Sequence, residues 1–450
     1  MSRLAILTLA PLYLFLSGIY WLPGISPAAL STFKTSLYLI ILLLGLTATP
    51  RLTPNTKSIL TLLALTAGLA FISNTLSEGV ATAAKQATDF LEPFFWLLAL
   101  SGLKTADIGR FINALRVSMA IFLPFLLYPI LVYADFLPNQ EAPSELIDLT
   151  SVSITEMDHW LTKSSILGGG FAGQSTTWGV IVAMYSVFLA SLVTQAPTHP
   201  FLRSTIAIGV LFCGLASTAV TSSRGGTLTI LAVGLYGFIS TRGLKKLHIF
   251  LLTLIGASFF TIALPQLLAD DFFRGLDGGA SALDMLNNAT TGRTLTFIFA
   301  LDAFLSSPIV GVGPNAAVHG MTQLQVHNTY LRILAESGLL VFLPTLFLCT
   351  NILRNAAKPN RAPLSKPALQ SHALPNGNLV LLAGYVLALA EPNVMFGTFN
   401  ANAVFWTAVW LTCQRGKPLT TKASGHEASP SQPERILPAP KRFESSKHAI

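Results

Sequence analysis

Long apolar runs follow one another along almost the whole of this 450-residue chain. Only 11% of its residues are charged, against about 25% in soluble domains, which is too few to cover a soluble surface. A helix needs roughly 20 mostly apolar residues to cross a bilayer. We therefore predict an all-α, polytopic membrane protein of about 12 transmembrane helices, over 4–22, 30–48, 58–73, 86–102, 111–134, 174–194, 204–221, 225–241, 247–268, 328–352, 379–391 and 398–413.

Basic residues concentrate in alternate connections between these runs. With the N-terminus in the cytoplasm, the inner segments hold most Lys and Arg residues, whereas the outer segments are rich in Asp and Glu. This is the positive-inside asymmetry of membrane proteins. An even number of spans places both termini in the cytoplasm, and the net charge of +8 then reflects topology and not nucleic-acid binding.

The connections divide the chain into four predicted parts. Residues 1–268 hold nine helices with an acidic periplasmic loop near 135–173, and 269–327 form a second long periplasmic loop. Residues 328–413 hold the last three helices. The remainder, 414–450, is rich in Pro, Ser and Lys, which predicts a disordered basic cytoplasmic tail.

One stretch of the second loop has a helical pattern. Leu295, Ile298, Phe299, Asp302 and Leu305 follow i, i+3, i+4 spacing, and a Ser-Ser-Pro sequence ends the pattern. We predict an amphipathic helix near 293–306 that lies at the outer membrane interface.

Two arginines are candidate phosphate ligands. Arg224 lies in a short outward turn, and a guanidinium binds phosphate oxygens bidentately while flanking glycines let a substrate approach. Arg293 begins the amphipathic helix, where free N–H groups already favour an anion. The alternatives are contact with lipid headgroups for Arg224 and an ion pair with Asp302 or another loop acid for Arg293.

A histidine is the candidate general base. His327 ends the long outer loop at the membrane edge, next to Asn328, and an imidazole has an unperturbed pKa near neutrality. His319 is a weaker candidate in the same loop. The alternative is an interfacial polar residue with no chemical role.

Further polar residues lie in or beside the last apolar runs. Arg332 and Glu336 are four residues apart on one helix face, where they either line a site or neutralise each other. Asp302 and Glu391 are weaker candidates. No His, Cys or Asp cluster has metal-ligand spacing, and no nucleotide-binding loop is present, so no metal or cofactor is expected.

Several motifs in the second half resemble the bacterial O-antigen ligase and O-antigen polymerase superfamily. They are SSRGG at 222–226, Gly292-Arg293, SPIVGVGPN at 307–315 and HNTYLRILAESGL at 327–339. The resemblance implies a multi-spanning glycosyltransferase of the bacterial inner membrane, with its active face in the periplasm.

The resemblance also implies the substrates and the roles of the site residues. The donor is a glycan on undecaprenyl diphosphate, Arg224 and Arg293 hold the diphosphate, and His327 activates the acceptor hydroxyl. The acceptor is a further glycan, a lipid A core or a protein. Val341 stands where the ligase pattern has a small or aromatic residue, which favours a polymerase, but both subtypes stay open. A transporter or flippase for a lipid-linked or anionic solute is the alternative from another class.

Overall fold

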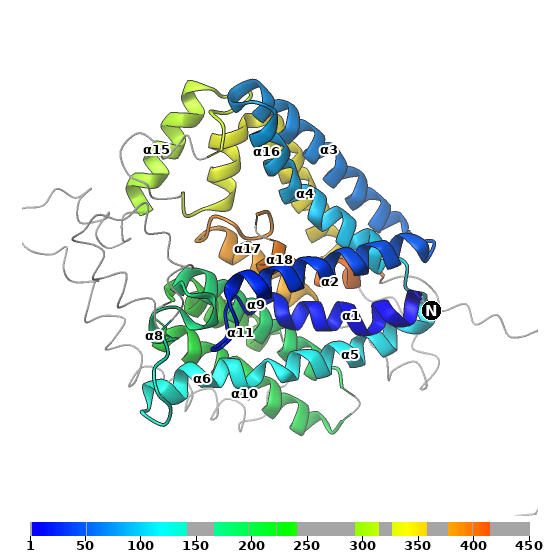
Figure 1. Ribbon diagram of the computed structural model, residues 1–450, viewed down its shortest axis with the longest axis vertical. Coiled ribbons are helices and arrows are strands. Elements are labelled where there is room, and N and C mark those ends of the chain that lie inside the picture. Colours follow the sequence, from blue (N-terminus) through cyan, green and yellow to red (C-terminus); the bar gives the residue numbers. More distant parts are fainter. Residues whose placement is uncertain are drawn as a thin grey trace, which may run out of the picture. The chain divides into compact units, whose positions relative to one another are not determined.

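The computed structural model describes residues 2–50, 52–141, 166–196, 198–221, 223–240, 293–314, 326–357, 377–397 and 399–414. These residues are mostly helical and form no strand, which confirms the predicted all-α class for this part of the chain (Figure 1). The predicted run 247–268, His319, most of both long loops and the tail lie outside the described residues.

The structure describes fourteen α-helices and two short 3-10 helices within these residues. In chain order they are α1 (Ser2–Ser17), α2 (Pro27–Thr47), α3 (Pro54–Glu78), α4 (Val80–Leu100), η1 (Thr105–Asp107), α5 (Ile108–Ile121), α6 (Leu123–Tyr133), α8 (Ile166–Gly169), η4 (Gly170–Ala172), α9 (Ser175–Val193), α10 (Pro200–Val220), α11 (Arg224–Ser240), α15 (Arg293–Ser306), α16 (Thr329–Ala357), α17 (Gly377–Ala388) and α18 (Phe399–Cys413).

Two of the longest helices begin in the same way. Ser26 precedes α2 and accepts a hydrogen bond from the Ala29 amide, and Thr53 precedes α3 and accepts one from the Thr56 amide. In both cases a proline follows the capping residue, where its fixed φ suits the first helical turn and its missing N–H costs nothing. The Thr53 cap lets α3 begin at Pro54, before the apolar run 58–73 that predicted it.

Six of the described helices are long and apolar enough to cross a membrane. They cover 27–47, 54–78, 108–133, 176–193, 200–220 and 329–357, and α1, α17 and α18 are shorter apolar helices. The chain is therefore a multi-pass membrane protein. The total of twelve spans stays a prediction.

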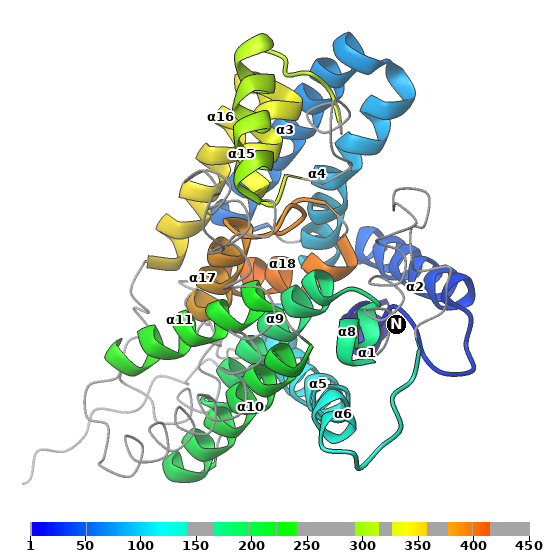
Figure 2. The ribbon, with the colours of Figure 1, turned by 90° about the vertical axis from the view of Figure 1, so that its left-hand side faces the viewer.

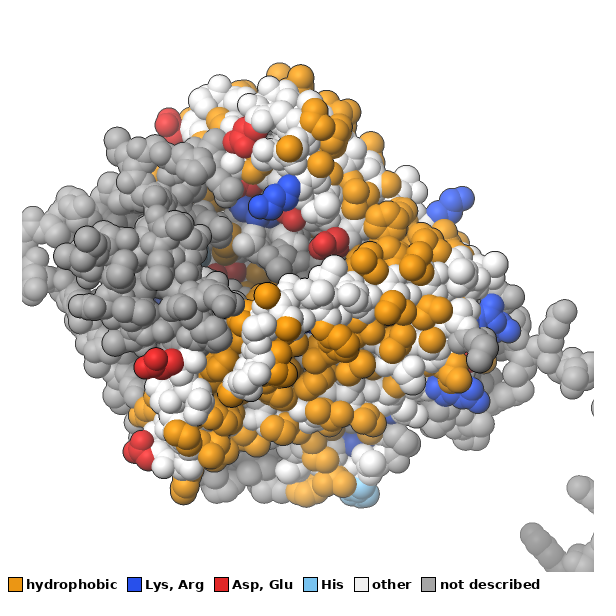
Figure 3. All heavy atoms as spheres, viewed as in Figure 1, with side chains coloured by type: hydrophobic (Ala, Val, Ile, Leu, Met, Phe, Trp, Pro, Cys, Tyr) orange, Lys and Arg blue, Asp and Glu red, His pale blue; other side chains and the backbone are white. Residues whose placement is uncertain are grey.

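The predicted inner ends of several helices meet. The Arg3 guanidinium at the start of α1 donates hydrogen bonds to Ala48 O after α2 and to Gly102 O after α4. Figure 3 shows Lys and Arg side chains mainly on the right of the view, the side of the N-terminus in Figure 1, and Asp and Glu toward the left. On this face, basic side chains therefore lie mainly toward the N-terminal end of α1, while the orientation of the helices in the membrane stays a prediction.

Helix α9 is central and helix α2 is peripheral. Of the most apolar window of each helix, 83% is buried in α9 but 28% in α2. The exposed face of α2 carries large apolar side chains such as Phe33 and Leu43, and Figure 3 shows extended apolar surface. Such a surface suits lipid rather than water. Figure 2 shows α9 close to α11 and α18.

Helix α16 is interrupted at Gly338, which has φ 62° and ψ −169°. The segment 307–313, which follows α15, lies against this break. The amides of Val312 and Gly313 donate to Ala335 O and Glu336 O, and the amides of Leu339 and Leu340 donate to Pro308 O and Ile309 O. Backbone groups released by the break are thus paired within the protein, as a non-helical backbone at membrane depth requires.

Helix α15 packs beside the first half of α16. Ala300 and Phe297 from α15 share a small apolar cluster with Ala335 and Val326, and both views place the two helices side by side (Figures 1 and 2). A helix over 293–306 is therefore present as predicted. Its position at a membrane interface stays a prediction.

Candidate functional site

His327 and Glu391 face each other at the predicted outer end of the helices. His327 Nδ1 lies 3.5 Å from Glu391 Oε2. The Glu391 side chain is only 4% exposed and that of His327 is 23% exposed. His327 Nδ1 is itself buried and makes no hydrogen bond within the described residues. The carboxylate therefore faces Nδ1 without a hydrogen bond to it, and Nε2 is the ring nitrogen that does not face Glu391.

Arg224 is the first residue of α11. The Thr227 amide donates to Ser223 O, and the Ser223 amide donates to Thr218 O at the end of α10. The turn between the two helices is thus tied to both of them. Arg224 is half-buried, and its position at a helix N-terminus adds the favourable field of the helix dipole to its own charge.

Glu391 connects this turn to His327. A β-carbon placed on Gly225 would lie 2.8 Å from Glu391 Oε1, so the other oxygen of the same carboxylate faces the start of α11. Arg224 is adjacent in sequence to Gly225. The structure therefore brings the Arg224 turn and His327 together through one buried carboxylate.

Close packing of two glycines holds the turn against α9. A β-carbon on Gly226 would lie 2.7 Å from Gly179 O and 2.8 Å from Gly179 Cα. Only residues without a side chain let the backbones of α9 and α11 approach this closely. The two glycines of the SSRGG motif therefore make room for different neighbours. Gly225 lies against Glu391, and Gly226 lies against α9.

Replacing Gly226 by Ala is expected to move the start of α11 and to weaken the fold by about 1–3 kcal/mol, the usual range for overpacking. Thermal unfolding of the detergent-purified protein would measure this. Gly234→Ala is the matched control on the same helix, because no atom lies within 4 Å of a β-carbon there. Equal melting temperatures for the two variants would contradict the packing role.

Asn328 and Thr329 fix His327 relative to the chain after α17. Asn328 Oδ1 accepts hydrogen bonds from the amides of Tyr330 and Leu331 and so caps α16. Its Nδ2 donates to Leu389 O at 3.2 Å, and the Thr329 hydroxyl donates to Glu391 O at 2.8 Å. Asn328, predicted to line the site, thus joins the start of α16 to the end of α17.

The segment 391–397 is an irregular loop with a constrained backbone. Met395 has a positive φ of 66°, which is uncommon for a residue with a side chain. Asn402 accepts from the Met395 amide and donates to Asn393 O, and the Trp406 indole donates to Met395 O. Such a conformation persists only where the surroundings enforce it, and it clusters at functional sites.

Arg332 binds this loop and helix α4 at the same time. Its guanidinium donates to Asn393 Oδ1 and, at 3.1 Å, to Phe396 O, and it lies 3.5 Å from Asp89 Oδ2. Its Nε lies 4.0 Å from Glu336 Oε2, beyond hydrogen-bond range. The i, i+4 pair predicted from the sequence is therefore loose, and Arg332 binds other segments more closely.

Glu336 is held by α4 in turn. Gln86 Nε2 donates to Glu336 Oε2 at 2.8 Å, and the Ser337 hydroxyl donates to Gln86 Oε1 at 3.3 Å. These contacts and those of Arg332 form a polar cluster between α4, α16 and the loop 391–397. We call it the Arg332 cluster and define it as Gln86, Asp89, Arg332, Glu336, Ser337 and Asn393.

Three predicted site residues are not placed at this site. Asp302 is exposed on α15, and none of the described contacts joins it to His327 or Arg332. The side chain of Arg293 and the whole of His319 lie outside what the structure describes. The described residues contain no group of three or more His, Cys, Asp or Glu that could hold a metal ion.

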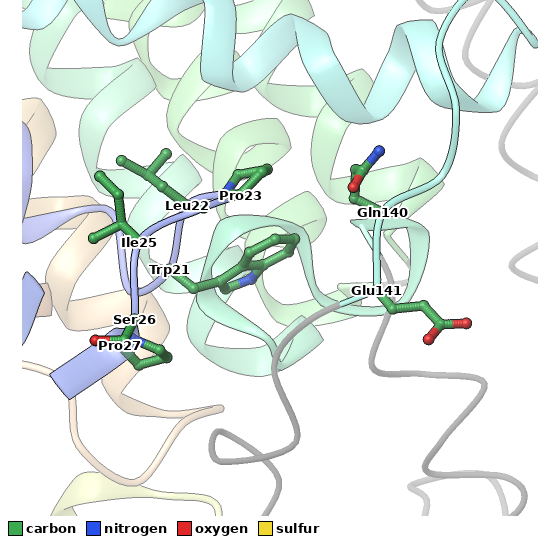
Figure 4. A pocket seen from close by; sticks show the side chains of 9 residues that line it. Trp21, Leu22, Pro23, Ile25, Ser26, Pro27, Gln140 and Glu141 are labelled. Carbon is green, nitrogen blue, oxygen red and sulfur yellow. The ribbon is translucent and has the colours of Figure 1, made fainter. Parts of the chain in front are cut away.

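A cavity of about 430 Å³ lies elsewhere (Figure 4). It is lined by residues 21–27, between α1 and α2, and by Gln140 and Glu141. None of the candidate residues lines it.

Four residues of the Arg332 cluster, Gln86, Asp89, Ser337 and Asn393, were not predicted as site residues from the sequence. Gln86 and Asp89 lie in α4, at and just after the start of an apolar run. An acidic residue within a predicted span is the signal that could have found Asp89. Asn393 lies in a connection after α17 and carries no comparable signal.

Residues 209–346 match the family model described as O-Antigen ligase. The match confirms the predicted resemblance to the O-antigen ligase and polymerase superfamily, which implies a glycosyltransferase type of enzyme. It includes Arg224, Arg293 and His327, whereas Glu391, Gln86 and Asp89 come from outside it. A comparison with curated proteins gave no match.

Proposed function

We propose, from the premise that residues 209–346 carry an O-antigen ligase domain, that this protein transfers a glycan from undecaprenyl diphosphate to an acceptor hydroxyl. It does so as an O-antigen or exopolysaccharide polymerase or as an O-antigen ligase, at the periplasmic face of the bacterial inner membrane, with both termini in the cytoplasm. The observation that carries the proposal is the convergence of His327 and the Arg224 turn on the buried Glu391 carboxylate.

His327 is the general base in this proposal. The acceptor hydroxyl oxygen bonds to the anomeric carbon of the donor, and the bond from that carbon to the diphosphate oxygen breaks. The bonding electron pair leaves with undecaprenyl diphosphate. The hydroxyl proton passes to His327 Nε2, and Glu391, 3.5 Å from Nδ1, stabilises the imidazolium that forms.

Arg224 binds the diphosphate group. Negative charge grows on the leaving diphosphate as the glycosidic bond breaks, and a fixed guanidinium at a helix N-terminus stabilises that charge without rearrangement. Arg293 begins α15, and we propose that it is the second diphosphate ligand. The long polyprenyl tail reaches the site sideways from the lipid, along the exposed apolar faces of the helices.

The charge distribution favours an enzyme over a transporter. Asp89, Arg332, Glu336 and Glu391 all lie on the start of α16 or on the segments that contact it, α4 and the loop 391–397. A transport path would need polar groups at successive depths through the described spans.

Replacing Arg224 by Gln is expected to lower the transfer rate about 10²–10³-fold, the range for losing one preorganised donor to a developing anion. The assay uses purified protein in proteoliposomes with the undecaprenyl-diphosphate glycan from the host strain. Lipid A core and the lipid-linked repeat unit are the two acceptors, and mass spectrometry identifies the product.

Arg110→Gln is the matched control, because Arg110 is an exposed arginine near the start of α5, at the opposite end of the helices. A full transfer rate in Arg224→Gln would contradict the diphosphate role. If the wild-type protein moves substrate across the vesicle membrane and forms no glycosidic product, the proposed enzyme activity itself is wrong.

A further inference from the structure

Two segments connect the Arg332 cluster to His327. The loop 391–397 is one of them, since Glu391 faces His327 and Asn393 accepts from Arg332. The start of α16 is the other, since Arg332 lies five residues after His327 in the sequence. The cluster and the Arg224 turn are therefore both joined to His327, the turn through Glu391.

The charges of the Arg332 cluster do not suit a diphosphate. It holds two carboxylates, Asp89 and Glu336, around the single guanidinium of Arg332. That guanidinium is already used by Asp89, Asn393 and Phe396 O. The exposed Lys85, one turn earlier on α4, adds only a longer-range attraction to Asp89. A diphosphate brought here would meet carboxylates at close range.

The cluster does suit hydroxyl groups. Carboxylates and amide oxygens accept hydrogen bonds from sugar hydroxyls, while amide and guanidinium N–H groups donate to them. Arg332 Nε is buried and makes no hydrogen bond within the described residues. The Asp89 side chain is 23% exposed and Gln86 is half-buried, so both can be reached from outside.

An aromatic contact joins α4 to the loop 391–397 beside the cluster. Phe90 directly follows Asp89, and the carbonyl of Phe396 accepts a hydrogen bond from Arg332. The two buried rings are tilted, with centroids 5.0 Å apart. This contact helps to fix the backbone that carries the polar groups of the cluster.

We propose that the Arg332 cluster binds the acceptor glycan, with Asp89 and Gln86 as direct hydrogen-bond partners of its hydroxyls, and that it presents one hydroxyl to His327. The proposal rests on the proposed function and adds to it a separate acceptor subsite. The same chemistry would serve the end of a repeat unit or of a lipid A core oligosaccharide.

The test separates acceptor binding from donor binding. Two acceptors without a transferable diphosphate are used, the alkyl glycoside of the repeat unit and the lipid A core from the host strain. The full chain in proteoliposomes is given saturating undecaprenyl-diphosphate glycan, and KM is measured for each acceptor. Donor KM is measured at saturating acceptor.

Asp89→Asn and Gln86→Ala are each expected to raise the acceptor KM about tenfold or more, the effect of losing one well-placed hydrogen bond, with donor KM changed less than about twofold. Thr88→Ala is the matched control, since Thr88 lies exposed on the same helix, next to Asp89. The acceptor whose KM responds identifies the source of the glycan.

Three results would overturn the inference. The first is an unchanged acceptor KM in both variants. The second is an equal rise in donor and acceptor KM together with a lower melting temperature, which would mean a structural role. The third is no product from the wild-type protein with either acceptor, which would also overturn the proposed function, whereas the first two leave it standing.

Discussion

Replacing His327 by Gln is expected to slow glycan transfer about 10²–10⁴-fold, the usual contribution of a positioned general base. Glutamine retains an uncharged polar side chain of similar reach beside Glu391, so the fold should persist. The glutamine side chain cannot take up the proton of the acceptor hydroxyl at neutral pH. The effect should appear in kcat, because the proton moves only as the new bond forms.

The matched control is His199→Gln. His199 is an exposed histidine that precedes α10, and its replacement should leave the transfer rate unchanged. Initial rates at saturating donor and acceptor, in proteoliposomes with equal amounts of inserted protein, provide the comparison. A His327→Gln rate within about threefold of wild type would exclude the general-base role, since that role implies at least about a hundredfold.

Replacing Glu391 tests the pair of His327 and Glu391 in a second way. If it acts through His327, Glu391→Gln should slow transfer in the wild-type background and have little further effect in His327→Gln. Such non-additivity is expected for two groups that act as a unit. Independent, additive losses would show that Glu391 acts elsewhere, for example on the Arg224 turn that its other oxygen faces.

Much of the fold could be predicted from the apolar runs because hydrocarbon leaves a spanning chain few alternatives to helix. The ends were harder to predict. Helix α3 extends to Glu78 and α4 begins at Val80, so polar turns are helical beyond the apolar window. The break at Gly338 within α16 was not predicted, because it lies inside the run 328–352 and a hydropathy average does not detect a single glycine.

The candidate site was predicted in part, from single residues and not from their contacts. His327 and the Arg224 turn drew attention because charged and polar groups are costly near a membrane. Their shared neighbour Glu391 was only a weak candidate, since its role depends on the fold of the segment 391–397. Asp302 fitted the helical pattern and lies exposed on α15, because hydropathy periodicity does not show which neighbours a helix face will have.

Replacing Gly338 by Ala is expected to have the largest effect on folding. Its φ of 62° and ψ of −169° lie in a region that is essentially restricted to glycine and costs another residue about 1–3 kcal/mol. A β-carbon there would also lie 2.3 Å from Ile309 O. This is a backbone atom of the segment that pairs with the break, so it cannot move aside without losing those hydrogen bonds.

The expected result is a sharp fall in the fraction of protein that elutes as a single species after detergent extraction, and a lower melting temperature for what remains. Gly68→Ala is the control, since Gly68 is exposed on α3, which packs against α16, and no atom lies within 4 Å of a β-carbon there. If both variants fold and melt alike, the interruption of α16 is not rigid. The Arg332 cluster, of which Arg332, Glu336 and Ser337 lie just before that break, would then lack the fixed geometry that acceptor binding requires.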